Sequence, residues 1–307
     1  YVPEDTDNSN PVPEKLETLR FEEMGLKEQL LRGIFSYGFE SPSIIQSKVI
    51  PLMIKGSDII AQAQSGTGKT GTFIISTLQL IDDTIPGCQA IVLVPTRELA
   101  IQICDVCSDL GNYMNVTPVL CVGGSNIQDS KKLLEKGTTI VIGTPGRIID
   151  LIQRKYLPVQ LIKLLVLDEA DEMLSFSFLK QIRTIIETLS ENAQICLFSA
   201  TMPASVVDLT RHFMRDPKMV LIKQEEISLE GIKQYYINVQ KDRWKLDTFC
   251  DIYDLVSISQ SMVYVNSKSR AEELKENLEE KNFAVSVIHS KMSPAERSEV
   301  MKDFRHG

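Results

Sequence analysis

A glycine-rich run constrains this chain more than any other feature of its sequence. It reads Ala63-Gln64-Ser65-Gly66-Thr67-Gly68-Lys69-Thr70. An apolar strand is predicted before it over residues 58–61, and a helix is predicted to start after it near residue 72. In a strand–loop–helix setting, loop N–H groups and a helix N-terminus can hold phosphates, with Lys69 near the β- and γ-phosphates and the Thr70 hydroxyl on Mg²⁺. The run therefore predicts a nucleoside triphosphate site.

An acidic run about a hundred residues later makes this interpretation specific. Leu164-Leu165-Val166-Leu167 predicts a buried strand, and Asp168-Glu169-Ala170-Asp171 follows it directly. At the carboxyl end of such a strand, Asp168 would reach the metal and Glu169 would orient or deprotonate a water. A glycine-rich turn and a solvated acidic run would be the structural alternative, and their combination in this order disfavours it.

Short apolar strands alternate with helical patterns along most of the chain. Helices are predicted over residues 27–37 and 43–53, and strands over 90–94, 119–122, 140–142, 164–167 and 194–198. This alternation predicts an α/β fold with a parallel sheet covered on both faces. We expect a flexible acidic tail over residues 1–20, a first domain over 21–222 and a polar linker over 223–231.

A second alternation follows over residues 232–307. It predicts strands at 235–239, 262–265 and 285–288 and helices at 244–255, 269–280 and 294–305. A domain usually has about 100–200 residues, so we expect this one to be truncated. Because the chain begins with Tyr1 rather than Met, we also expect it to be a fragment.

Composition limits the kinds of partner and compartment. The net charge is −8, so contacts with nucleic acid must come from a few local side chains. The six cysteines predict reduced thiols, and the pair Cys104 and Cys107 predicts core or surface positions rather than a metal or redox site. The three histidines are scattered, and no apolar run resembles a signal peptide or membrane span. We expect a cytoplasmic location, with the nucleus as the alternative.

Six further short segments carry a resemblance. They are Phe39-Glu40-Ser41-Pro42-Ser43-Ile44-Ile45-Gln46, with Phe21 upstream; Pro95-Thr96-Arg97-Glu98-Leu99-Ala100; Gly123-Gly124; Thr144-Pro145-Gly146-Arg147; Ser199-Ala200-Thr201; and Met262-Val263-Tyr264-Val265-Asn266-Ser267-Lys268. With the glycine-rich and acidic runs, they resemble the DEAD-box RNA helicases in order and spacing. The segments Phe21-Glu22-Glu23-Met24, Ala61-Gln62-Ala63-Gln64 and Trp244-Lys245-Leu246-Asp247-Thr248 look like the branch that contains translation initiation factor 4A.

The resemblance implies two RecA-like parallel-sheet domains of the P-loop NTPase type, the second truncated, and ATP and Mg²⁺ as cofactors. Gln46 would read the adenine, with Phe21 and Phe39 as ring contacts. The triphosphate would lie on Ser65, Gly66, Thr67, Gly68, Lys69 and Thr70. Thr70 and Asp168 would hold the metal, and catalysis would fall to Lys69, Asp168 and Glu169.

The resemblance also implies contacts with the RNA backbone and a coupling device. RNA would lie on Thr96, Arg97, Gly123, Thr144 and Arg147. Asp171, Ser199 and Thr201 would link hydrolysis to strand separation. In the second domain, Ser267 replaces the usual threonine, His289-Ser290-Lys291-Met292 departs from the family's phrasing, and the motif that supplies an arginine finger does not occur.

The sequence thus predicts an ATP-dependent RNA helicase that binds RNA without sequence preference, as single strands or duplex ends. Translation initiation, with protein partners, is the expected setting. Two alternatives stay open. One is an ATP-dependent RNA clamp in exon-junction, splicing or ribosome-assembly complexes. The other is a DNA helicase or translocase, which Gln46 and the Asp168–Asp171 run together disfavour.

Overall fold

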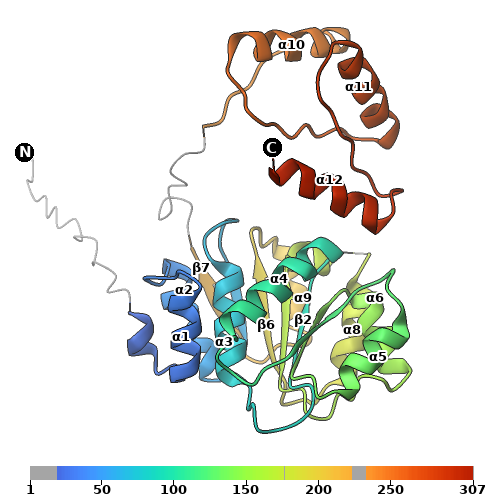
Figure 1. The fold of residues 1–307 in the computed structure, drawn as a ribbon. Coiled ribbons are helices and arrows are strands. Elements are labelled where there is room, and N and C mark those ends of the chain that lie inside the picture. Colours follow the sequence, from blue (N-terminus) through green and yellow to red (C-terminus); the bar gives the residue numbers. More distant parts are fainter. Residues whose placement is uncertain (1–18, 176, 223–232, 307) are drawn as a thin grey trace, which may run out of the picture. The chain divides into compact units, whose positions relative to one another are not determined.

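The computed structural model describes residues 19–175, 177–222 and 233–306, drawn as a coloured ribbon in Figure 1. The chain divides into two compact units, Tyr1–Leu229 and Glu230–Gly307. The predicted linker and all but the last two residues of the predicted tail lie outside the described residues. No helix in the described part of the chain is long and apolar enough to cross a bilayer.

A seven-stranded sheet forms the centre of the first unit. Its strands are β1 (Ile59–Gln62), β2 (Ala90–Leu93), β3 (Pro118–Cys121), β4 (Ile140–Gly143), β5 (Leu164–Asp168), β6 (Gln194–Ser199) and β7 (Lys218–Leu221). Their spatial order is β3-β4-β2-β5-β6-β1-β7, and every pairing is parallel. The predicted α/β fold with a parallel sheet is therefore confirmed for this unit.

One strand at the edge of the sheet, β7, was not predicted. Among the described residues, β7 pairs only with β1. Met219 and Leu221 are about half exposed there, while Val220 between them is buried. An edge strand with one open face lacks the continuous buried run that marks the central strands, so its apolar signal is weak.

Helices flank both faces of the sheet. They are the 3₁₀-helix η1 (Phe21–Met24) and the α-helices α1 (Glu28–Ser36), α2 (Ile44–Ile54), α3 (Lys69–Leu80), α4 (Arg97–Leu110), α5 (Ile127–Glu135), α6 (Pro145–Gln153), α7 (Ala170–Met173), α8 (Leu179–Thr188) and α9 (Ala204–Thr210). Several start where the sequence offers a capping side chain. Ser43 accepts from the Gln46 N–H, Thr96 from Leu99 and Asn126 from Gln128. Pro145 opens α6, where its missing N–H costs nothing.

Two hydrophobic cores lie on opposite faces of the sheet. One joins η1 and α1–α4 to alternate strand residues such as Ala90 and Val92. The other joins α6–α9 to the residues between them, such as Ile91 and Leu93. Because successive strand residues point to opposite faces, both faces must be apolar, as the continuous strand runs predict.

The second unit is helical in its described part. It contains the 3₁₀-helix η3 (Asp242–Trp244) and the α-helices α10 (Lys245–Leu255), α11 (Lys268–Glu280) and α12 (Pro294–His306). Rings of α10 pack on Phe283, with the Tyr253 and Phe283 centroids 5.3 Å apart.

Within residues 233–306, no strand is assigned to the segments predicted at 235–239, 262–265 and 285–288. Strand structure requires a hydrogen-bonded neighbour, and these segments have no such ladder. Their large side chains are correspondingly open, and Tyr236 is 92% exposed. Apolar alternation alone predicted strands that the described contacts do not support.

All six cysteines are free. Both Cys104 and Cys107 lie on α4, where Cys107 is fully buried in the core and Cys104 is half-buried. Burial raises the pKa of Cys104 to about 11 and that of Cys88 and Cys121 to about 12. These thiols are therefore protonated and weakly nucleophilic near neutral pH.

Candidate functional site

Most of the predicted site residues follow the carboxyl ends of strands, which lie at one edge of a parallel sheet. The strand order divides this edge into two halves. The phosphate loop, the acidic run and the Ser199–Thr201 loop follow β1, β5 and β6, which are neighbours. The predicted RNA contacts follow β2, β3 and β4, which are also neighbours.

Side chains of the phosphate loop donate hydrogen bonds to carbonyl oxygens of the same loop. Lys69, only 7% exposed, donates from Nζ to the Ala63 carbonyl oxygen at 2.7 Å. Thr67 Oγ1 donates to the Gln64 carbonyl at 2.7 Å. Gly68 caps α3 with φ of 100°, a conformation that side chains strain to adopt. The loop thus holds the Lys69 ammonium group at the first turn of α3. Ser65 and Gly66 are exposed, and Thr70 is half-buried.

Helix α2 packs directly against the start of α3. Gln46 is 3% exposed. Its Oε1 accepts from the Ser43 N–H at 2.8 Å, and its Nε2 donates to the Gly68 carbonyl at 3.5 Å. A Cβ at Gly71 would lie 2.7 Å from that Nε2, so only glycine allows this approach. Each end of the Gln46 amide makes one bond here, which leaves one N–H and one oxygen lone pair for an adenine edge.

The two predicted ring contacts differ in accessibility. Phe21 is fully buried and lies in the core, with its ring stacked 6.5 Å from that of Phe39. Phe39 is half-buried, with the Tyr37 ring 5.0 Å away. Phe39 therefore remains a candidate. Phe21 stays a prediction as a ring contact, and in this structure its buried ring packs against that of Phe39.

Two carboxylates meet at the end of β5. Asp168 is 5% exposed, and its Oδ1 accepts from the Glu169 N–H at 3.0 Å. Burial, followed by the charge of Glu169, raises the pKa of Asp168 to about 6, although Lys69 acts in the opposite direction. Glu169 adopts a left-handed conformation with φ of 50°, a strain that is common at functional sites.

This donor set fits a magnesium ion. A buried carboxylate with a raised pKa gains from a nearby divalent cation, and a carboxylate with a hydroxyl is the hard oxygen set that Mg²⁺ prefers. Asp168, at the end of β5, supplies the first, and Thr70, on α3 after β1, supplies the second; β6 lies between these two strands.

The Ser199–Thr201 loop joins the acidic run to the phosphate loop. Thr201 Oγ1 donates to Asp171 Oδ2. Burial works to raise the pKa of Asp171, but the bond from Thr201 and the neighbouring Ser199 hydroxyl outweigh it, so this pKa lies below its usual value. Ser199 is fully buried, and its Oγ has no hydrogen bond of good geometry in the described structure.

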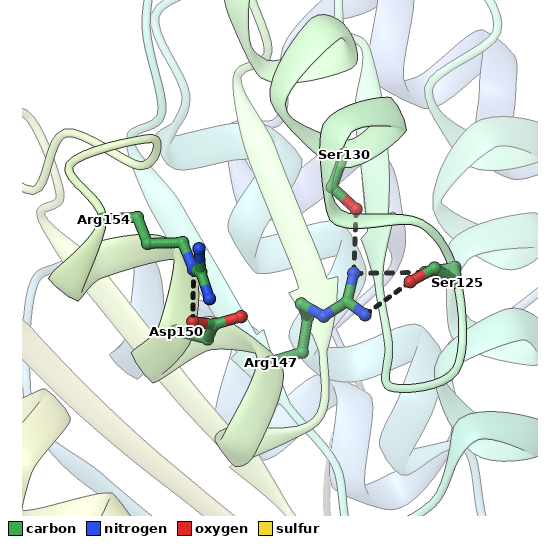
Figure 2. A network of polar contacts seen from close by, with 5 residues as sticks. All are labelled: Ser125, Ser130, Arg147, Asp150 and Arg154. Carbon is green, nitrogen blue, oxygen red and sulfur yellow. Dashed lines mark hydrogen bonds and ion pairs between the residues drawn. The ribbon is translucent and has the colours of Figure 1, made fainter.

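Two arginines hold one loop in the other half of the edge. Arg97 donates to the Gly123 carbonyl at 2.8 Å. Figure 2 shows Arg147 reaching the same loop, where it donates to the Ser125 carbonyl at 2.7 Å and the Ser125 Oγ at 3.3 Å. A further bond of 3.4 Å reaches Ser130 Oγ on α5. Each guanidinium thus bonds only to neutral oxygens among the described residues and keeps its positive charge uncompensated.

This edge agrees with what the comparisons find. The pattern of the DEAD/DEAH box helicase family matches residues 43–209, and that of the helicase conserved C-terminal domain matches residues 244–307. The chain belongs to the DEAD/DEAH box helicase family. It is 51% identical to eukaryotic initiation factor 4A of Drosophila melanogaster over 94% of this chain and 71% of that protein.

Other members of the family give the same result. The chain is 50% identical to the ATP-dependent RNA helicase eIF4A of Pyricularia oryzae, over 94% of this chain and 72% of that protein. It is similar in structure to Saccharomyces cerevisiae Dbp5 bound to RNA and ADP BeF3, with a TM-score of 0.85 and 33% identity, covering 94% of this chain and 73% of the other.

Within this helicase, Thr96 and Thr144 lie at the starts of α4 and α6. Thr96 Oγ1 accepts from the Leu99 N–H, whereas the Thr144 side chain makes no capping bond. Gly123 is exposed in the loop between β3 and α5. The structure therefore brings all five predicted RNA contacts to one half of the edge, on three adjacent strands.

Ser125 and Ser130 bond Arg147 but were not among the predicted site residues. No motif marks them. The signal that was present is spacing: Asn126 caps α5, and Ser130 lies one turn further along, where it is 4% exposed. A polar residue buried on the first turns of a helix needs a partner, and for Ser130 that partner is Arg147.

Proposed function

We propose that this chain is an ATP-dependent RNA helicase that acts in translation initiation. A single sheet edge carries a phosphate loop with two carboxylates on one half and an arginine-held loop on the other. That adjacency supports coupling of nucleotide chemistry to a polyanion. Relatives about 50% identical carry the names initiation factor 4A and ATP-dependent RNA helicase.

Mg-ATP would bind on the β1–β5–β6 half. Lys69 would leave the Ala63 carbonyl for the β- and γ-phosphates, and Thr70 and Asp168 would hold the ion, which neutralises the phosphate charge. Glu169 would orient the attacking water, or accept its proton. Phosphoryl transfer asks a protein mainly for positioning and charge stabilisation, and these groups supply both.

RNA would bind on the β2–β3–β4 half. Arg97 and Arg147 would offer their uncompensated charges to backbone phosphates, and Thr96, Thr144 and the exposed Gly123 would add neutral contacts. Such contacts carry no sequence information, so binding would be independent of sequence. The solved relative Dbp5 was bound to RNA and ADP BeF3, which supports this assignment.

The domain assignment is part of the proposal. Residues 21–222 would bind nucleotide and RNA, 223–231 would link, and 232–307 would belong to the second RecA-like domain. A role in translation would place the protein in the cytoplasm, with protein partners from that machinery.

The alternative is an ATP-dependent RNA clamp. The Thr201–Asp171 bond favours the helicase, because it provides a link between hydrolysis and the RNA-binding state that a static clamp does not need. The test measures ATP turnover and duplex separation with RNA and with DNA of the same sequence. RNA-stimulated, multiple-turnover hydrolysis with RNA unwinding supports the helicase. A single turnover with retained product would replace it with the clamp, and equal stimulation by DNA would contradict RNA specificity.

A further inference from the structure

The strand before the phosphate loop is joined to the Ser199–Thr201 loop by more than the regular sheet ladder. Strands β1 and β6 pair in register up to Gln62 opposite Ser199. Beyond that point the Ala63 N–H donates to the Ser199 carbonyl at 3.1 Å. Because the Ala63 carbonyl accepts from Lys69 Nζ at 2.7 Å, a single residue, Ala63, bonds to both the phosphate-binding lysine and the Ser199–Thr201 loop.

Gln62 extends this connection by one residue. Its side-chain Nε2 donates to the Ala200 carbonyl at 3.3 Å. The backbone of β1 has turned away into the phosphate loop there, so the side-chain amide takes over the next acceptor. Two successive carbonyls of the loop, those of Ser199 and Ala200, are thereby tied to β1.

The polar side chains of the Ser199–Thr201 loop differ in their hydrogen bonding. Thr201 is bonded to Asp171, whereas the fully buried Ser199 hydroxyl lacks a bond of good geometry. A buried hydroxyl without a partner is costly, and it gains when a small shift brings one within reach. A small shift of the loop would therefore improve the contact of Ser199 with Asp171, and the position of the loop relative to β1 decides that contact.

We propose that Gln62 is a positioning residue that passes movement of the phosphate loop to the Ser199–Thr201 loop. This inference rests on the proposed function. When phosphates draw Lys69 away from the Ala63 carbonyl, the backbone at Ala63 is free to adjust. The Gln62 side-chain amide then makes the Ser199–Thr201 loop move with this backbone. Without that amide only the Ala63–Ser199 bond remains, and nucleotide chemistry is transmitted less completely.

The test replaces the amide by a side chain of similar size that cannot donate, Gln62→Met, in the intact protein. We expect the number of RNA duplexes separated per ATP hydrolysed to fall about 3- to 10-fold, the range expected for one hydrogen bond. ATP affinity and RNA affinity should stay within about twofold, because Gln62 contacts neither. Gln62→Glu, which places an acceptor against the Ala200 carbonyl, should lower the ratio at least as far.

Gln102→Met is the matched control, since Gln102 is exposed on α4 and makes no bond among the described residues. A cycle with Thr201→Val should be non-additive, because both changes act through one loop. An unchanged ratio in Gln62→Met overturns the inference. So does an equal fall in hydrolysis and unwinding together with a lower melting temperature, which marks a purely structural role. If the unmodified protein neither hydrolyses ATP with RNA nor unwinds it, the proposed function itself fails and takes this inference with it.

Discussion

The two halves of the sheet edge handle charge in opposite ways. On the β1–β5–β6 half, Lys69 and Asp168 are buried, and both are bonded within the protein. On the β2–β3–β4 half, Arg97 and Arg147 are half-buried and bond only to carbonyl and hydroxyl oxygens of one loop and of Ser130. On the first half the bonded charges are buried, with Glu169 and Asp171 half-buried beside them, whereas the second half holds two half-buried cations bonded to neutral oxygens.

This difference indicates that one sheet edge can bind two kinds of anionic ligand. A buried charge interacts strongly over a short range, so the first half suits a ligand held at defined atoms. A half-exposed guanidinium that is hydrogen-bonded to neutral oxygens suits a repeating phosphate backbone, which can bind in any register. Removing a charge should therefore be more costly on the first half.

The largest effect is expected at Glu169. Glu169→Gln keeps the size of the side chain but removes the group that accepts a proton or aligns water, so RNA-stimulated ATP turnover should fall about 10²- to 10⁴-fold. Nucleotide and RNA affinities should change little. Glu172→Gln, exposed on the same short helix, is the control. Turnover measured beside nucleotide affinity checks this, and normal hydrolysis in Glu169→Gln would rule the assignment out.

Lys69 should rank next. Lys69→Ala removes the buried cation of the phosphate loop, and Mg-ATP affinity should fall about 10- to 100-fold, as expected for a charged hydrogen bond. Lys180→Ala, at an exposed position on α8, should bind normally. Titration calorimetry with a non-hydrolysed analogue measures both. Equal affinities would mean that Lys69 stays on the Ala63 carbonyl when nucleotide binds.

The buried Asp168 predicts a pH effect on the metal-free protein. Its pKa is raised from 3.8 to about 6, so the folded state binds more protons than the unfolded state between these values. Stability should therefore fall as pH rises from about 4 to about 6, by up to roughly 3 kcal/mol. Asp168→Asn should match the unmodified protein near pH 4 and be more stable at pH 7. Denaturant unfolding at both pH values measures this, and identical pH profiles would contradict it.

On the other half, Arg147→Ala should weaken single-stranded RNA binding about tenfold. It should also lower the slope of log affinity against log salt by about 0.7 for the lost phosphate contact. Arg154 on the same helix is already paired with Asp150 at 2.6 Å, so Arg154→Ala should change neither quantity (Figure 2). Fluorescence anisotropy across a salt series distinguishes them, and equal losses in both variants would remove the special role of Arg147.

The smallest effect is expected at Ser130. Ser130→Ala removes one neutral acceptor of Arg147 and should weaken RNA binding only about two- to threefold, with the salt slope unchanged because no charge is lost. The control is Ser108→Ala, an exposed serine on α4 whose hydroxyl bonds its own helix. A changed salt slope in Ser130→Ala would show that the serine acts on more than the position of Arg147.

Much of the fold and the site was predictable because strong local patterns coincide with tertiary layers. The continuous apolar runs before Asp168 and Ser199 identified central strands, since a strand buried on both faces needs apolar residues at every position. The same reasoning failed at β7, which has an open face, and at residues 262–265, where apolar residues occur without a hydrogen-bonded neighbour.

By itself, the sequence determined the order of strands and helices, the phosphate loop and the paired carboxylates, because each depends on residues close together in the chain. Only the tertiary structure decided that Phe21 is buried beneath Phe39, that Gln46 bonds Gly68, and that Gln62 reaches Ala200. The physical reason is that a hydrogen bond or ring contact depends on distance and direction in space. Residues 22 or 138 positions apart acquire that geometry only when the sheet and its helices pack.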